Sequence, residues 1–319
     1  MFQLHDYLSC LETLVNLDSG SNSPEKICAV ADLLCQWFDD LGWTITRHDL
    51  GPQTGPLLEI SNGSQDHYDA VLLGHMDTVF PDGDAARRPF RTEGNRAYGP
   101  GVADMKNGDV AMLFIARELA AMGDRQPSVC MLFNPDEELG SCYSAEKMIE
   151  IMTKSSRLFV MESAIHYRHC HSRRGRLAFD VRFTGQAAHA GHMLLRSGAS
   201  AILEAAKWTE EICGMVNAAA GISANVGRIE GGLARNIVPA DAMLSAEIRT
   251  DRRIDIERLH ERLQQMAASP FVPGVQVRLE NVTLKQPLEP GEATLAYLDT
   301  VRSVAAELGQ NFETGCYPV

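Results

Sequence analysis

A buried strand that ends in acids constrains the fold more than any other feature of this sequence. Residues 128–141 read SVCMLFNPDEELGS, in which an apolar run over 129–133 leads to Asp136, Glu137 and Glu138. Such a run is typical of a strand covered on both faces. Three adjacent carboxylates repel one another, so they indicate either a solvated turn or a bound cation.

The first half of the chain alternates between strands and helices. Ser23 and Pro24 predict a helix start, because serine is a good N-cap and proline suits the first helical position. The predicted strands cover 69–77, 128–134 and 157–162, and the predicted helices cover 24–41, 107–123 and 144–152. This order predicts an α/β fold, with a mostly parallel sheet and helices on both faces. Ligand sites in such sheets lie beyond the carboxyl ends of the strands.

The pattern changes after residue 163. The polar, basic stretch 165–176 predicts a linker, and the strictly alternating residues that follow predict a half-exposed strand. Further elements in the order β-α-β-β-α-β predict an inserted, ferredoxin-like α+β domain over 172–284. We expect the helix 292–309 to return to the first domain. The predicted catalytic domain therefore comprises residues 1–171 and 285–319.

Composition narrows the class of protein. The formal net charge of −13 excludes nucleic acid as a main partner, because phosphate binding requires a basic face. No apolar run reaches the ~18–20 residues that would span a membrane. The eight cysteines form no CxxC pairs and are expected to be reduced thiols, which predicts a cytoplasmic protein.

Potential metal ligands gather at the predicted strand ends. They are His75, Asp77, Glu137, Glu138 and Glu162, joined by Asp104 from a glycine-rich loop. One imidazole with several carboxylates suits zinc or another divalent metal. A shared carboxylate that bridges two ions ~3.5–4 Å apart would account for the number of acids. Taken alone, each acid has another interpretation: Asp104 is explained equally well as a helix N-cap, and Glu162 as one partner of a salt bridge at a strand end.

Five motifs, in order and at matched spacing, resemble one family. They are GHMDTVFPDG, PFRTEGNRAYGPGVADMKNG, LFNPDEELGS, TGQAAHAG and RNIVPADAMLSAEIR. The family is that of the co-catalytic di-zinc exopeptidases, which includes bacterial glutamate carboxypeptidase, aminoacylases and desuccinylases. The glutamate carboxypeptidase branch is the closest match. The resemblance extends over nearly the whole chain.

The resemblance implies two zinc ions and a ligand for each. His75 and Glu162 would bind the first ion, Glu138 would bind the second, and Asp104 would bridge both. In the family, a further histidine near the C-terminus is a ligand of the second ion. This chain ends at Val319, about where the loop before that histidine should begin. We therefore expect a C-terminal segment to be missing, the second ion to bind weakly and activity to be low.

The resemblance also implies the catalytic groups. Glu137 would be the general base toward a metal-bridging water, and it would pass the proton to the leaving amine. Asp77 would not ligate but would hold the His75 ring and fix its tautomer. A retained Glu137 favours an enzyme over a non-catalytic metal or amino-acid binder, which is the alternative class.

The same resemblance also implies roles for residues of the inserted domain. His189 would reach the site of a partner subunit, which implies a homodimer through 172–284. Asn236 and Arg249 would hold a substrate carboxylate. Alternatively, Asn236 is a turn residue and Arg249 forms an ion pair on the face of a strand. Lys285 and Gln286 stand where close relatives carry an arginine that grips this carboxylate. A lysine offers a point charge without the bidentate fork, which puts glutamate specificity in doubt.

Together these features predict a metallopeptidase that hydrolyses an amide bond. The expected substrates are small peptides or N-acyl amino acids, from which it would release a C-terminal amino acid. Deacylation of N-acyl amino acids, as in the aminoacylases, is the alternative chemistry.

Overall fold

The structure, a computed structural model, describes residues 2–63, 66–164, 168–191 and 198–317. The chain divides into two compact units, Met1–Ser163 and Ala164–Val319. Each unit has its own hydrophobic core. No helix in the described part of the chain is long and apolar enough to cross a membrane.

The first unit contains a five-stranded sheet and its covering helices. The strands of this sheet are β1 (Thr44–His48), β2 (Leu57–Ser61), β3 (Ala70–His75), β6 (Val129–Asn134) and β7 (Leu158–Val160). The helices are α1 (Leu4–Val15), α2 (Pro24–Asp39), α3 (Asp84–Arg87), α4 (Asn107–Ala120) and α5 (Ala145–Met152). A small hairpin is formed by β4 (Arg91–Glu93) and β5 (Arg96–Tyr98).

The strand order of this sheet is β1-β2-β6-β3-β7. β3 pairs in parallel with β6 and β7, whereas β2 pairs antiparallel with β1 and β6. Parallel pairing is therefore confined to the three strands that precede the acidic residues. β1 and β2 were not predicted, and they make the sheet more mixed than expected.

The predicted strand at the centre of the sheet is buried on both faces. Val129, Met131 and Phe133 of β6 belong to the core formed with α1, α2 and α4. Cys130 and Leu132 belong to a second cluster, formed with α5 on the opposite face. Successive residues of a strand point to opposite faces, so an uninterrupted apolar run serves both clusters. The α/β class and the helices on both faces are confirmed.

The second unit contains an antiparallel sheet. Its strands are β9 (Gly175–Thr184), β11 (Ser223–Gly231), β13 (Asp241–Thr250) and β14 (Gln276–Lys285), and its helices are α6 (Ala201–Gly214) and α7 (Arg253–Ala268). The unit also holds β8 (Arg168–Arg173), β10 (Ala188–His189), β12 (Ile237–Val238), α8 (Glu292–Glu307) and β15 (Glu313–Tyr317).

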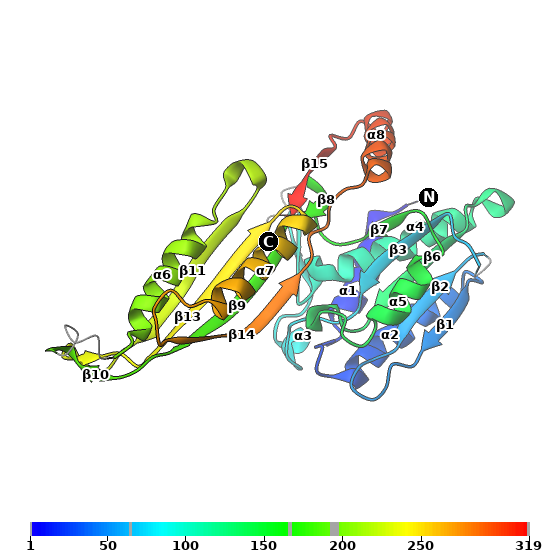
Figure 1. Ribbon diagram of the computed structural model, residues 1–319. Coiled ribbons are helices and arrows are strands. Elements are labelled where there is room, and N and C mark those ends of the chain that lie inside the picture. Colours follow the sequence, from blue (N-terminus) through cyan, green and yellow to red (C-terminus); the bar gives the residue numbers. More distant parts are fainter. Residues whose placement is uncertain (1, 64–65, 165–167, 192–197, 318–319) are drawn as a thin grey trace. The chain divides into compact units, whose positions relative to one another are not determined.

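The sheet order β11-β13-β9-β14 is that of a ferredoxin-like fold. Leu177, Phe179, Val181 and Phe183 of β9 alternate into the core beneath α6 and α7. Ala178, Asp180 and Arg182 occupy the positions between them. The predicted half-exposed strand is therefore present, and its apolar side chains pack with those of α6 and α7. Both helices lie on one face of the sheet (Figure 1).

The predicted linker contains a strand, which corrects the sequence interpretation. Residues 165–167 lie outside the described residues, but β8 pairs in parallel with β15 near the C-terminus. The division into compact units also places residues 285–319 with the second unit rather than the first. Their predicted membership of the catalytic domain stays a prediction.

Candidate metal centre

Three neighbouring parallel strands bring the acidic groups to one edge of the first sheet. His75 is the last residue of β3, the acidic triplet follows β6, and Glu162 follows β7. Because these strands are parallel neighbours, their carboxyl ends meet at the same edge. The pairing explains why residues so far apart in the sequence converge.

The His75 imidazole lies at the centre of this group and is 2% exposed. Its Nε2 atom lies 3.0 Å from a Glu162 oxygen and 3.1 Å from an Asp104 oxygen. Burial alone lowers the pKa of the ring, but hydrogen bonds to Asp104, Asp77 and Glu162 outweigh burial and raise the pKa well above its usual range. Without a metal, the ring therefore holds a proton that a cation would displace.

Asp77 is fully buried and ties three segments together. Its carboxylate accepts hydrogen bonds from Ser21 Oγ at 2.7 Å and from the backbone N–H groups of Glu137 and Glu138 at 3.0 and 3.2 Å. His75 Nδ1 lies 2.9 Å from the backbone oxygen of Asp77 and 3.3 Å from its carboxylate. Asp77 thus lies behind the ring, on the side away from Glu162. Ser21 was not predicted, since one hydroxyl in the stretch DSGSNSP carries no distinctive signal.

Glu137 and Glu138 occupy a short 3-10 turn, Glu137–Leu139, directly after β6. A Glu137 oxygen lies 4.0 Å from His75 Nε2, and its side chain is 52% exposed. Burial raises the pKa of Glu137, although the nearby charge of His75 opposes the shift. Burial and the charge of Asp104 raise the pKa of Glu138 to about 7. Carboxylates crowded in this way are stabilised in their charged form by a cation.

The third acid of the triplet has a different task. Asp136 is buried, and its Oδ2 atom accepts a hydrogen bond from the N–H of Tyr143 at 2.7 Å. Its backbone oxygen accepts hydrogen bonds from the N–H groups of Leu139 and Ser141. Asp136 therefore shapes the turn that presents Glu137 and Glu138. The triplet is not merely a solvated turn.

Asp104 lies in a tight segment, Val102–Lys106, just before α4. Its backbone is not helical, with φ −129° and ψ 97°, and the N-cap of α4 is Lys106. The alternative of Asp104 as a helix N-cap is therefore wrong. The hydroxyl of Ser163 donates a hydrogen bond to the backbone oxygen of Ala103, which joins this segment to the residues after β7.

Two buried charged groups beneath the site were not predicted. Lys106 is 1% exposed, and its ammonium donates a hydrogen bond to the Leu17 oxygen at 2.6 Å. Burial lowers the pKa of Lys106 to about 8. Asp109 is fully buried, and neither carboxylate oxygen has a hydrogen-bond partner among the described residues. Burial raises the pKa of Asp109 well above its usual range.

The residues at the strand ends fit a divalent metal. Two sets of side chains place one potential ligand atom each within 4.8 Å of one another: His75 with Asp104 and Glu138, and His75 with Glu137 and Glu162. One nitrogen with carboxylate oxygens is a donor set that zinc and similar ions accept. All four predicted ligands belong to these sets. Glu137, which we expect to be the general base, belongs to one of these sets as well.

The four predicted residues of the second unit form two groups. His189 pairs with Ile237 across the β10–β12 ribbon, and the N–H of Ala190 donates to the Asn236 oxygen at 2.9 Å. The His189 and Asn236 segments therefore lie side by side. Asn236 itself lies in a turn.

Arg249 and Lys285 form the second group, in one row of the large sheet. Both are register partners of Arg176 on β9. Glu247 accepts hydrogen bonds from Nε of Arg176 at 2.5 Å and Nε of Arg249 at 2.6 Å. The predicted strand-face ion pair of Arg249 is therefore present. Its role toward a substrate carboxylate stays a prediction.

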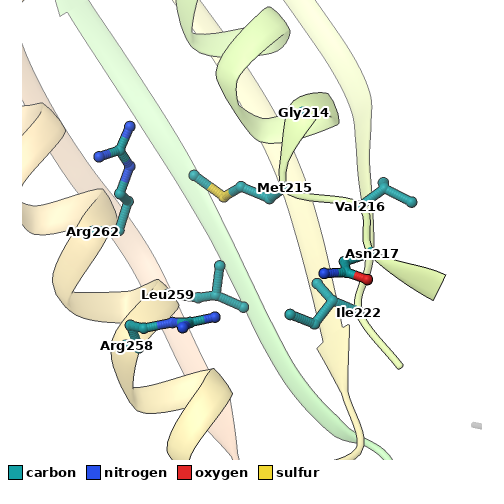
Figure 2. A pocket seen from close by; sticks show the side chains of 8 residues that line it. All are labelled: Gly214, Met215, Val216, Asn217, Ile222, Arg258, Leu259 and Arg262. Atoms are coloured by element: carbon teal, nitrogen blue, oxygen red, sulfur yellow. The ribbon is translucent and has the colours of Figure 1, made fainter. Parts of the chain in front are cut away.

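A hollow in the second unit brings together none of the predicted site residues. It lies between α7 and the segment that follows α6, and its volume is about 320 Å³ (Figure 2). Arg258 and Arg262 line one side. Both already pair with carboxylates, at 3.3 Å from Asp255 and 2.9 Å from Glu211.

Comparison with known proteins agrees with this geometry. The profile of Peptidase family M20/M25/M40 matches residues 71–316. Carboxypeptidase G2 of Pseudomonas sp. (strain RS-16) is 29% identical over 306 residues, which cover 95% of this chain and 74% of that protein. Acetylornithine deacetylase of Edwardsiella ictaluri is 24% identical over 89% of this chain and 76% of its own length.

A solved structure shares the fold. A tripeptidase of Staphylococcus aureus superposes with a TM-score of 0.77 at 20% identity, covering 99% of this chain and 85% of its own. The resemblance seen in the motifs is thus confirmed over most of the chain. The chain belongs to peptidase family M20/M25/M40 and is a metal-dependent hydrolase.

Proposed function

We propose that this protein is a zinc-dependent hydrolase that releases a C-terminal amino acid from small peptides or N-acyl amino acids. The observation that carries the proposal is that two sets of side chains around one imidazole each place their ligand atoms within 4.8 Å of one another: His75 with Asp104 and Glu138, and His75 with Glu137 and Glu162. His75 and Glu162 would bind one ion, Glu138 a second, and Asp104 both. A bound divalent ion would polarise the amide carbonyl and acidify a water molecule.

The chain's own residues would move the proton. Glu137 is the carboxylate nearest to Nε2 of His75 that the metal proposal leaves unassigned, with a raised pKa and a half-exposed side chain. A general base works best when its pKa lies near the operating pH, so this shift suits the role. Glu137 would take a proton from the attacking water and return it to the leaving amine. Asp77 would hold the His75 ring and the backbone of Glu137 in place during this transfer.

The test is Glu137→Gln in the zinc-loaded chain, with Glu146→Gln on the exposed surface of α5 as the matched control. We expect hydrolysis to fall by ~10²-fold or more in Glu137→Gln and to be unchanged in the control. Zinc content, measured by mass spectrometry, should be similar in both. Full activity in Glu137→Gln would overturn its role as the base. No hydrolysis by the zinc-loaded wild type would favour a non-catalytic binder.

A deacylase is the second candidate, because acetylornithine deacetylase is among the relatives of this chain. The two chemistries break the same kind of bond and differ in the group preferred on the acyl side. A panel of dipeptides, N-acetyl amino acids and N-acylglutamates would separate them through kcat/KM. A clear preference for free dipeptides would exclude the deacylase.

In the second unit, we propose that His189 assists catalysis in a partner subunit and that Asn236, Arg249 and Lys285 hold the substrate carboxylate. Exposed apolar residues on α6 and around β11 support self-association. They are Ile202, Leu203, Ile229, Leu233 and Ile237. β11 is also an edge strand, whose unpaired backbone groups can extend a sheet.

Mixing two inactive variants tests the dimer and His189 together. Glu137→Gln removes the base from one subunit, and His189→Ala removes the imidazole from the other. If His189 acts across the interface, the mixed dimer regains one intact site, and activity returns on mixing. Sedimentation velocity gives the oligomeric state. A monomer, or no recovery in a proven mixed dimer, contradicts the proposal.

We place this activity in the cytoplasm, because the eight cysteines occur as thiols rather than disulfides, a state that a reducing compartment maintains.

A further inference from the structure

The hollow between α7 and the segment that follows α6 has the features of a second binding site. It lies within the second unit, and none of the residues proposed for catalysis lines it (Figure 2). Its volume of about 320 Å³ falls within the ~300–1,000 Å³ range of small-molecule sites. The walls come from residues 214–217, Ile222 and one face of α7. The hollow is therefore large enough for a small ligand.

Part of the wall is apolar. Leu259 and Ile222 are buried members of the core of the second unit, and Met215 packs against the same core. Figure 2 shows Met215 and Leu259 extending from opposite walls toward the space between them. An apolar group placed there would leave water, which favours binding.

The charged part of the wall is basic. Arg258 and Arg262 are the charged residues among the described residues that line the hollow, and they lie one turn apart on α7. Arg258 lies 3.3 Å from Asp255, but Asp255 also pairs with Arg252 at 2.9 Å and would keep that partner. Arg262 pairs with Glu211 at 2.9 Å on the exposed surface. A guanidinium has five N–H donors, so both arginines retain donors for a ligand.

Asn217 presents a further donor on the wall opposite α7. Its side-chain oxygen accepts a hydrogen bond from the N–H of Ala220 at 3.2 Å, and its backbone exchanges two hydrogen bonds of 2.9 Å with Ile222. These bonds fix the amide, so that its NH₂ group faces α7, the helix that carries Arg258 (Figure 2). This NH₂ group has no hydrogen-bond partner among the described residues. A guanidinium and an amide NH₂ on opposite walls suit an anionic oxygen group.

We propose that this hollow binds a small carboxylate with an apolar body, such as an arylalkanoate. The carboxylate accepts hydrogen bonds from Arg258 and from the NH₂ group of Asn217, and Arg262 adds a second positive charge. The apolar body lies against Met215 and Leu259. A simple inorganic anion leaves the apolar wall unused, and an uncharged compound leaves the arginines unused. The inference does not rest on the proposed function, because no metal ligand or catalytic group takes part.

Methyl NMR tests this site, with sodium 3-phenylpropanoate as the probe and ¹³C-labelled methionine methyl groups as reporters. The Met215 signal, assigned with Met215→Leu, should shift until the site is saturated. The signal of Met148, a buried residue of α5 in the first unit, should stay in place. A Met215 signal that does not shift would overturn the proposal.

Three further compounds test which chemistry the hollow selects. 3-Phenylpropanamide lacks the charge, sodium propanoate lacks the ring, and inorganic phosphate lacks the apolar body altogether. Each should bind at least about tenfold more weakly than 3-phenylpropanoate, since each loses either charge-assisted hydrogen bonds or apolar burial. Equal binding of the amide would contradict the role of the arginines. Equal binding of phosphate or propanoate would contradict the role of the apolar wall.

Two variants and a matched control locate the contacts. Asn217→Asp keeps an oxygen to accept from Ala220 but replaces the NH₂ group with a negative oxygen, and Arg258→Gln removes the guanidinium. Each should weaken binding about tenfold or more. Arg252→Gln is the control, because Arg252 is the other partner of Asp255 and does not line the hollow. An equal loss in Arg252→Gln would mean that Arg258 acts only through Asp255. A dispersed methionine spectrum shows that each variant is folded.

Titrations with and without zinc separate this site from the metal centre. Carboxylates also ligate metals, so a probe bound at His75 and its neighbours would need zinc. We expect the affinity seen at Met215 to be the same in both states. Affinity that requires zinc would place the probe at the metal centre and overturn the assignment. A chain that binds the probe but hydrolyses no substrate would leave this site intact and contradict only the proposed function.

Discussion

At the residue scale, the candidate site consists of one imidazole surrounded by carboxylates. Few other cationic side chains lie near enough to neutralise the charge of these carboxylates. The grouping of the four predicted ligands could be expected from the sequence, because each ends or follows a strand or lies in a glycine-rich loop. Ser21, Lys106 and Asp109 could not be found in this way. They act through burial and through contacts with distant segments, and no local pattern encodes either.

Asp77→Asn should weaken zinc binding while leaving the fold intact. An amide cannot accept from Ser21, Glu137 and Glu138 as a charged carboxylate does, so the turn and the ring would both lose their support. Losses of this kind cost ~10–100-fold in metal affinity. Competition with a zinc indicator measures the change, and Asp124→Asn on the exposed surface is the control. Equal affinities in the two variants would show that Asp77 has no such role.

Zinc affinity should rise steeply with pH through neutrality. In the metal-free protein, His75 has a raised pKa and Glu138 has a pKa of about 7, so both hold protons below neutral pH. Zinc must displace these protons, and each tenfold drop in proton concentration therefore favours binding. Calorimetry in buffers of different ionisation enthalpy at about pH 6 and about pH 8 counts the protons released. No proton release at the lower pH would contradict these shifts.

At the scale of elements, burial decided which strands could be predicted. β6 and β9 show clear apolar patterns because their neighbours cover one or both faces. β8 could not be predicted, since its residues are polar and its partner β15 lies far away in the sequence, near the C-terminus. The basic composition of this segment indicates solvent exposure correctly. It does not reveal a strand whose partner lies far away in the sequence.

The polar face of the second sheet should show its own dependence on pH. Hydrogen bonds from Arg249 and Arg176 lower the pKa of Glu247, although burial opposes them. A carboxyl with a lowered pKa stabilises the fold above its unfolded pKa of ~4.3, and this contribution is lost as the pH falls through the folded value. We expect Glu247→Gln to reduce the free energy of unfolding by about 0.5–1 kcal/mol at pH 7 and by almost nothing near pH 3.

Urea unfolding at several pH values measures this difference. Glu257→Gln on the exposed face of α7 is the matched control and should change stability little at any pH. A loss in Glu247→Gln that is equally large at pH 3 and pH 7 would mean that the ion pairs are not its cause.

At the scale of the whole molecule, the proposed site residues divide between the two units. The proposed metal ligands all belong to the first unit, and the groups proposed to hold the substrate carboxylate all belong to the second. The family match spans both units, from residue 71 to residue 316. A ligand that binds only the folded form of one unit stabilises that unit by mass action. Zinc is therefore expected to act on the two cores unequally.

The three tryptophans can report this difference. Trp37 and Trp43 pack with the first core, and Trp208 is fully buried in the second. Trp37→Phe with Trp43→Phe leaves Trp208 to report the second unit, whereas Trp208→Phe leaves the first. At a free zinc concentration of ~100 Kd, the first unit should gain about 2.7 kcal/mol, seen as a higher melting temperature by fluorescence. The signal of Trp208 should shift much less. Equal shifts in both variants would mean that the two units unfold as one, and that the metal centre stabilises the entire chain.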